Sequence, residues 1–215
     1  MRLLQLSSPA LPVGAFSYSQ AMEWAMDCGA LSNEEEILAW ICDCLEFGST
    51  RFEAVYLAAM MKIWKLGDFD RLKALDSEFK ASRESSELLA ETLQMGHSMM
   101  RLLADIGEIP NAALFPSPSF PLAWSAAAAA WDIDEKEAIS GYLWSWAENQ
   151  VMAAVKAMPL GQTAGQRMLL KLGAKLSILA GEILKIPVGE ASNFLPAFSI
   201  ASCLHETQYA RLFKS

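Results

Sequence analysis

Apolar side chains recur at helical spacing along almost the whole chain, and this periodicity limits the possible folds more than any other feature. One clear example is the apolar series Ile37, Leu38, Ile41, Cys44 and Leu45. No stretch shows the alternation of apolar and polar residues that a half-buried strand requires. The pattern predicts an all-α, single-domain, multi-helix bundle of about eight to ten helices over residues 1–215.

Capping residues and helix breakers set the expected helix ends. Ser32 with Glu35, and Asp134 with Glu137, form capping boxes. The proline-rich residues 107–121 cannot be regular structure, and we expect an N-terminal loop over about residues 1–16. The expected helices span about residues 17–28, 33–47, 51–66, 68–80, 85–106, 121–131, 134–158, 162–185 and 196 to near the C-terminus.

The composition excludes several classes of protein. Apolar residues make up 53% of the chain and charged residues 20%, the opposite of a disordered sequence. The net charge of −8 disfavours nucleic acid as a partner. No apolar run reaches the ~18–20 residues that span a bilayer, so no membrane partner is expected. The 4 cysteines lack a disulfide-framework spacing and predict free thiols in a reducing cytoplasm.

Groups that could hold a metal or carry out catalysis are scarce. The chain has 2 histidines and lacks both the phosphate-binding glycine loops and the nucleophile-elbow motif. Cys42 and Cys44, like Cys203 and His205, are two residues apart, so on a helix their side chains would point ~200° apart. Neither pair can chelate one ion without unwinding the helix, and no metal site is expected.

Lys156 leaves two interpretations open. It lies in a mostly apolar stretch just before Pro159. A desolvated lysine can act as a Schiff-base nucleophile, which would make this chain an all-α small-molecule enzyme. Otherwise its stem covers apolar surface while its charge reaches water. A buried setting among polar groups would favour the enzyme, and an exposed one a non-catalytic interaction protein, which the 7 Trp, 10 Phe and 11 Met also favour.

The C-terminus is more specific than a helical core requires. Tyr209, Leu212 and Phe213 follow an i, i+3, i+4 pattern, so we expect the last helix to present them as an apolar stripe. Terminal residues normally fray. We therefore expect this tail, residues 205–215, to dock either on a partner or on the chain's own bundle.

Three stretches are long and specific enough to compare with known families. Residues 11–24 read Leu-Pro-Val-Gly-Ala-Phe-Ser-Tyr-Ser-Gln-Ala-Met-Glu-Trp, residues 155–166 contain Lys-Ala-Met-Pro-Leu-Gly-Gln, and residues 205–215 read His-Glu-Thr-Gln-Tyr-Ala-Arg-Leu-Phe-Lys-Ser. In this order they resemble motifs of the urease accessory protein UreF family. The chain departs from those motifs at Ala15 and Ala21, where the family has glycine, at Ala210 and Lys214, where it has Ser and Arg, and at Trp124, where a small residue is expected.

The resemblance implies an all-α homodimer that works in the cytoplasm as a scaffold without catalysis or a tightly bound cofactor. UreF proteins bind UreD, also called UreH, and together these recruit and regulate the GTPase UreG, which delivers nickel to apo-urease. Nickel would then be handled by the assembled complex. His97, His205 and the cysteines could line its path but show no closed ligand set. A helical interaction domain unconnected with nickel is the other alternative.

The resemblance also implies which residues contact partners. We expect the tail to dock as a helix in a groove of UreD. Lys156, with Tyr18 and Glu23 as contact residues, is expected to act on the GTPase, either by supplying a cation to the phosphates or, as we favour, by stabilising one switch state. The expected partner-binding residues are Tyr18, Glu23, Lys156, Gln162, Gln166, His205, Glu206, Gln208, Tyr209, Arg211, Leu212, Phe213 and Lys214.

Overall fold

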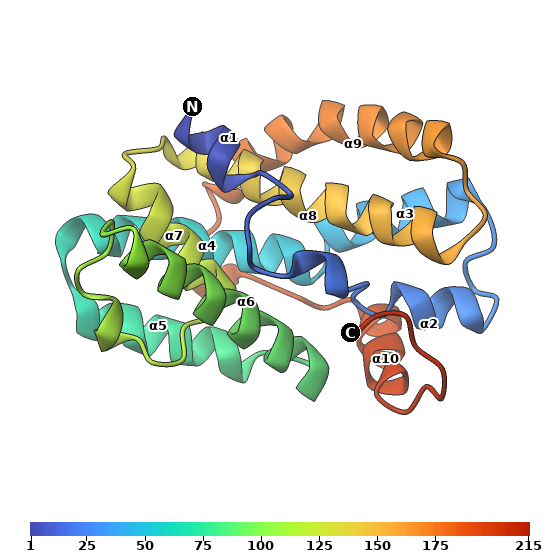
Figure 1. Ribbon diagram of the computed structural model, residues 1–215, viewed down its shortest axis with the longest axis horizontal. Coiled ribbons are helices and arrows are strands. Elements are labelled where there is room, and N and C mark those ends of the chain that lie inside the picture. The colour runs from blue at the N-terminus through green and yellow to red at the C-terminus, as the bar shows by residue number, and fades with distance from the viewer.

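The computed structural model describes residues 1–215 as helices joined by turns, without a β-strand (Figure 1). The expected all-α fold is confirmed. The α-helices are α1 (Arg2–Leu6), α2 (Met22–Asp27), α3 (Glu34–Glu46), α4 (Ser49–Leu66), α5 (Phe69–Ala81), α6 (Ser86–Asp105), α7 (Phe120–Ala130), α8 (Glu135–Ala157), α9 (Gln162–Ile183) and α10 (Pro196–His205). Three short 3-10 helices are η1 (Ala15–Ser17), η2 (Ala112–Leu114) and η3 (Val188–Glu190).

Most helices begin where the capping signals predict. The side chains of Asp68 and Ser85 each accept a backbone N–H at the starts of α5 and α6, and that of Asp134 accepts two at the start of α8. Gly67, with φ of 70°, ends α4 in the left-handed conformation that glycine adopts without strain. These starts and stops depend on residues only a few positions apart, which is why the sequence predicts them.

The capping box expected at Ser32 and Glu35 is wrong by one residue. Asn33 caps α3, and its Oδ1 accepts the N–H groups of Glu35 and Glu36 at 3.0 Å each. The carboxylate of Glu36 reaches back to the N–H of Ser32 at 2.7 Å, and this hydrogen bond lowers the pKa of Glu36. Asn caps a helix as well as Ser does, so sequence type alone does not choose between Ser32 and Asn33. Helix α3 begins after Asn33 because this residue has the spacing that lets its side chain accept from the N–H groups of the glutamates.

The helix expected over residues 17–28 is also wrong in its first half. Gln20 and Ala21 have φ of 50° and 65°, so the chain forms η1, turns, and begins α2 only at Met22. Left-handed non-glycine residues cost about 1–2 kcal/mol each. Burial of both side chains holds them in place. The segment expected as a loop over residues 1–16 carries α1 as well.

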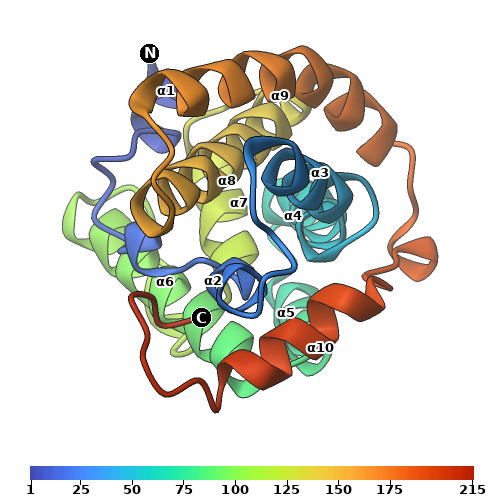
Figure 2. The ribbon, with the colours of Figure 1, turned by 90° about the vertical axis from the view of Figure 1, so that its right-hand side faces the viewer.

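The last helix is shorter than expected. It ends at His205, and residues 206–215 form turns and bends that fold back, so that the C-terminus lies beside α2 (Figures 1 and 2). The N–H groups of Leu212, Phe213 and Lys214 bond to Glu23 and to the carbonyl of Ser17 instead of to carbonyls one turn earlier. The expected apolar helical stripe at the C-terminus is therefore wrong.

The alanine-rich α7 forms the centre of the core. It packs against α4, α6 and α8, and Ala126 to Ala128 are fully buried. Trp124 is fully buried too, and its ring meets that of Tyr142 edge-on with centroids 5.2 Å apart. Where α6 passes the start of α7, a Cβ on Gly96 would lie 2.2 Å from the carbonyl oxygen of Pro118.

The remaining helices surround this centre. Helices α8 and α9 lie side by side, and α10 packs on α2 at one end of the molecule (Figure 1). Figure 2 shows the residues after α10 returning toward α2 and α6. None of the helices has both the length and the hydropathy needed to cross a lipid bilayer.

Candidate functional site

Segments from both ends of the chain and from the end of α8 meet in one place, which we call the motif junction (residues 17–23, Lys156 and 205–215). The N–H and the hydroxyl of Ser19 both donate to the carbonyl oxygen of Ser215, each at 2.8 Å. The N–H of Lys214 donates to the carbonyl of Ser17 at 2.8 Å, and Lys156 Nζ lies 4.8 Å from the centre of the Phe213 ring. The three motifs of the sequence thus form one structural unit.

Glu23 is the central acceptor of the motif junction. It lies in the first turn of α2 and is buried. Its Oε1 accepts the N–H of Leu212 at 2.6 Å, and its Oε2 accepts the N–H of Phe213 at 3.0 Å. Its Oε2 also lies 3.5 Å from Nε2 of His205. One buried carboxylate therefore holds two consecutive backbone groups of the tail.

His205 is fully buried between two carboxylates. Its Nδ1 lies 2.6 Å from Oε2 of Glu87, on the opposite side from Glu23. Arg211 forms an ion pair with the other oxygen of Glu87. Both ring nitrogens thus face carboxylate oxygens. The end of α10 and the tail are thereby tied to α2 and α6.

Glu206 fixes the start of the tail to α6. Its Oε1 accepts from the hydroxyl of Ser86 at 2.6 Å and from the N–H of Ser86 at 2.7 Å. These hydrogen bonds lower the pKa of Glu206. A carboxylate at the first turn of a helix is also favoured by the helix dipole.

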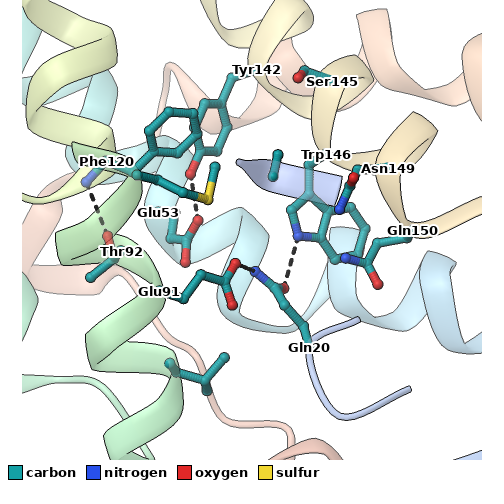
Figure 3. Close-up of a pocket in the computed structure, with 13 residues that line it drawn as sticks. Gln20, Glu53, Glu91, Thr92, Phe120, Tyr142, Ser145, Trp146, Asn149 and Gln150 are labelled. Carbon is teal, nitrogen blue, oxygen red and sulfur yellow. Dashed lines mark hydrogen bonds between the residues drawn. The ribbon is translucent and has the colours of Figure 1, made fainter. Parts of the chain in front are cut away.

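Beneath the tail, Glu91 on α6 joins a second chain of hydrogen bonds (Figure 3). Its oxygens accept from the hydroxyl of Ser215 at 2.6 Å and from Nε2 of Gln20 at 2.7 Å. The Gln20 carbonyl in turn accepts from the indole N–H of Trp146 at 2.8 Å. Burial raises the pKa of Glu91 to about 7, although these two donors oppose the shift.

Glu91 also borders a cavity of about 30 Å³, which has room for about two water molecules. Glu53 lines the same cavity (Figure 3), and its oxygens accept from Tyr142 at 2.5 Å and from Arg83 at 2.7 Å. The Arg83 guanidinium lies 4.4 Å from the centre of the Phe79 ring. Burial raises the pKa of the Tyr142 hydroxyl well above its ordinary value.

The structure places most of the expected partner-binding residues in or beside the motif junction. Tyr18 and Glu23 are buried within the chain, and the Tyr18 hydroxyl donates to Gln94 at 2.9 Å. Gln162 and Gln166, by contrast, are exposed on the first turns of α9 and make no hydrogen bond to the junction. Contact of these residues with a partner stays a prediction.

Within the tail, the side chains divide between inside and outside. Phe213 is buried in the main hydrophobic cluster, whereas Tyr209 is fully exposed and Leu212 is 60% exposed. Lys214 is also exposed. The Nε2 of Gln208 donates to the carbonyl of Ala210 at 3.1 Å and so closes a local turn. Docking on the chain's own bundle, one of the two expectations, is thus observed for Phe213 but leaves Tyr209 and Leu212 free.

Sequence reasoning missed the residues outside the tail that hold it by hydrogen bonds and ion pairs. Glu87 and Glu91 come from one face of α6, one turn apart, and Ser19 comes from the segment before α2. Glu91 offered a signal, since it is next to Thr92 in a helix whose apolar stripe includes Leu88 and Met95. A carboxylate beside the buried stripe of a helix indicates a partner that only the tertiary structure supplies.

Lys156 is exposed at the end of α8 and does not border the cavity. This exposed setting favours a non-catalytic interaction protein over an enzyme that uses Lys156 as a nucleophile. All 4 cysteines are free thiols, and no three side chains of His, Cys, Asp or Glu lie together as a metal-ligand set.

Comparison with known proteins identifies the family. A sequence model of UreF matches residues 31–173. The chain is 52% identical to the urease accessory protein UreF of Azoarcus sp. (strain BH72), over 100% of this chain and 95% of that protein. It is 50% identical to UreF of Dechloromonas aromatica (strain RCB), over 100% and 96%, and 44% identical to UreF of Methylobacillus flagellatus, over 100% and 97%. The chain belongs to the UreF family of urease accessory proteins.

Proposed function

We propose that this chain is a non-catalytic scaffold in urease maturation. Together with UreD/UreH it recruits and regulates the GTPase UreG, so that nickel is inserted into apo-urease. The observation that carries the proposal is the motif junction, where the three family motifs meet and the tail leaves Tyr209 and Leu212 exposed. A site built from hydrogen bonds within the chain, with apolar side chains outside it, suits the binding of another protein.

The tail and α10 offer the surface for UreD/UreH. On α10, Ile200 and Leu204 lie one turn apart and are exposed, and Tyr209 and Leu212 continue the exposed apolar residues along the tail. Clustered exposed apolar residues mark protein interaction sites, and aromatic side chains contribute most to such interfaces. Because the tail is not helical, it docks as an irregular segment held by its own chain, and not by the helix-in-groove mode.

Replacing Tyr209 and Leu212 together by serine should abolish co-purification with UreD/UreH. Both side chains point away from the bundle, so the change should alter the free energy of unfolding by no more than about 0.5 kcal/mol. The matched control replaces Leu170 and Ile178 on α9, which are 78% and 65% exposed. Binding that survives the tail variant, or is lost equally in the control, would contradict this docking surface.

Lys156 is the residue proposed to act on the GTPase. Its exposed ammonium group lies over Phe213, so it links α8 to the tail. We favour conformational control, in which the scaffold stabilises one state of the switch loops, because this needs no contact with the phosphates.

Lys156→Ala should therefore change how much active urease is produced per GTP hydrolysed while the complex still assembles. Lys156→Arg, which keeps the charge and the contact with the ring, should behave nearly as the parent chain. The measurement is GTP turnover and urease activation in the same reconstituted mixture. Unchanged coupling in Lys156→Ala would reduce Lys156 to a surface lysine.

Nickel is cargo in this proposal, and no cofactor belongs to the chain. His205 is engaged by Glu23 and Glu87, and His97 is exposed on α6. We propose that nickel passes through the assembled complex, in the cytoplasm, with the chain as a homodimer.

A further inference from the structure

We infer that Glu23 is the positioning residue for the C-terminal tail, and that its buried carboxylate holds the tail in the shape that turns Tyr209 and Leu212 outward. This inference rests on the proposed function in one respect only, namely that the outward-facing Tyr209 and Leu212 bind a partner. The geometry itself belongs to the chain alone, because every group involved comes from α2, α6, α10 or the tail.

The contacts show why Glu23 and not a tail side chain sets this shape. Its two oxygens accept the N–H groups of Leu212 and Phe213, at 2.6 and 3.0 Å. Adjacent N–H groups aimed at one carboxylate fix the backbone between Arg211 and Phe213. Phe213 then turns into the core while Leu212 turns out. The side-chain pattern of the tail follows from this backbone arrangement.

Burial makes the arrangement depend on the carboxylate. Glu23 and Phe213 are both buried, so without Glu23 the Phe213 N–H would lose its partner in a place that water does not reach. Hydrogen bonds to a charged acceptor are also the stronger kind. His205 would lose one of the two carboxylates that flank it. No other side chain accepts from the N–H groups of Leu212 or Phe213.

The other attachments of the tail lie on either side of this point. Arg211 pairs with Glu87, and Ser215 bonds to Ser19 and Glu91. Loss of Glu23 should therefore release the segment around Leu212 locally and leave the helical bundle folded.

Limited trypsin digestion of the full chain tests this release without any partner. Mass spectrometry would follow cleavage after Arg211 in the tail and after Lys185, an exposed residue in the turn after α9, in the same sample. In Glu23→Ala the ratio of tail cleavage to Lys185 cleavage should rise at least about tenfold, since each hydrogen bond to a charged group is worth about a factor of ten or more in local opening. Glu23→Gln, which keeps one acceptor oxygen, should fall in between.

Glu182→Ala serves as the control, because Glu182 is an exposed glutamate on α9 without a side-chain hydrogen bond to the tail. An unchanged ratio in Glu23→Ala would overturn the inference. So would an equal rise at both sites, which reports general destabilisation and not tail release. If Glu23→Ala does not fold, the ratio of tail cleavage to Lys185 cleavage in Glu23→Gln serves as the test. A rise in that ratio supports the inference, and an unchanged ratio overturns it.

Binding of UreD/UreH to the same variants separates the positioning role from the proposed function. Faster tail cleavage together with weaker binding supports both. Faster tail cleavage with unchanged binding supports the positioning role and contradicts the proposed use of the tail.

Discussion

Replacing Arg83 by methionine should lower the free energy of unfolding by about 3–5 kcal/mol, the usual cost of removing one partner from a buried ion pair. The Arg83 side chain is 1% exposed, and its guanidinium donates to Glu53 at 2.7 Å. Methionine keeps the contact with the rings of Phe79 and Phe52 but leaves Glu53 buried without its cation. Urea denaturation followed by circular dichroism measures the loss.

The size of the effect follows from the position of Glu53. It lies on α4 and is joined to Tyr142 on α8 and to Arg83 between α5 and α6, so three parts of the bundle meet at one carboxylate. The hydroxyl of Ser49 also lies 3.2 Å from Glu53. Removing the cation leaves the negative charge buried with only neutral donors.

A second substitution shows whether the stranded charge causes the loss. Glu53→Gln in the Arg83→Met background should restore part of the stability, because a neutral amide can still accept from Tyr142 and donate to Ser49. Arg101→Met is the matched control, since Arg101 pairs with Asp105 at the surface and should cost no more than about 0.5 kcal/mol. Strictly additive effects of Arg83→Met and Glu53→Gln would show that the pair is not coupled.

How far the sequence predicts this structure depends on the distance over which each determinant acts. Asp68, Ser85 and Asp134 each meet their partners within three residues, so their helices begin where expected. The end of α10 is different, because the groups that compete for the tail N–H bonds come from Glu23 and Ser17 near the other end of the chain. Helical periodicity alone carries no information about that competition.

The candidate site is also predicted only in part, because its contacts join residues far apart in the sequence. Resemblance to family motifs indicates residues such as Glu23, His205 and Phe213, and the structure brings them together. It does not indicate that Glu23 faces inward, nor that Glu91 lies beneath Ser215. The resemblance also does not indicate the backbone conformation at Ala15 and Ala21, where the family motif has glycine. Ala15 lies in η1 without a positive φ, whereas Ala21 keeps the left-handed conformation at φ of 65°.

Replacing Glu91 by glutamine should remove about 3 kcal/mol from the difference in unfolding free energy between pH 5 and pH 8, at about 1.4 kcal/mol per pKa unit. The pKa of Glu91 is about 7 in the folded chain, against an ordinary value of 4.5. Between these values the folded state holds a proton that the unfolded state has released. The stabilisation by Glu91 is thus complete below about pH 4.5 and is lost as the pH rises through about 7.

Glutamine suits this place because both existing hydrogen bonds can remain. Its carbonyl can accept from Gln20 while its amide donates to the hydroxyl of Ser215, which serves as donor or acceptor. Relative to the parent chain, Glu91→Gln should therefore gain stability at pH 8 and change little at pH 5. Glu182→Gln, at an exposed position on α9, should leave the pH dependence within about 0.5 kcal/mol of the parent. Urea denaturation at the two pH values measures all three chains, and an unaltered pH dependence in Glu91→Gln would show that this carboxyl does not hold its proton under the tail.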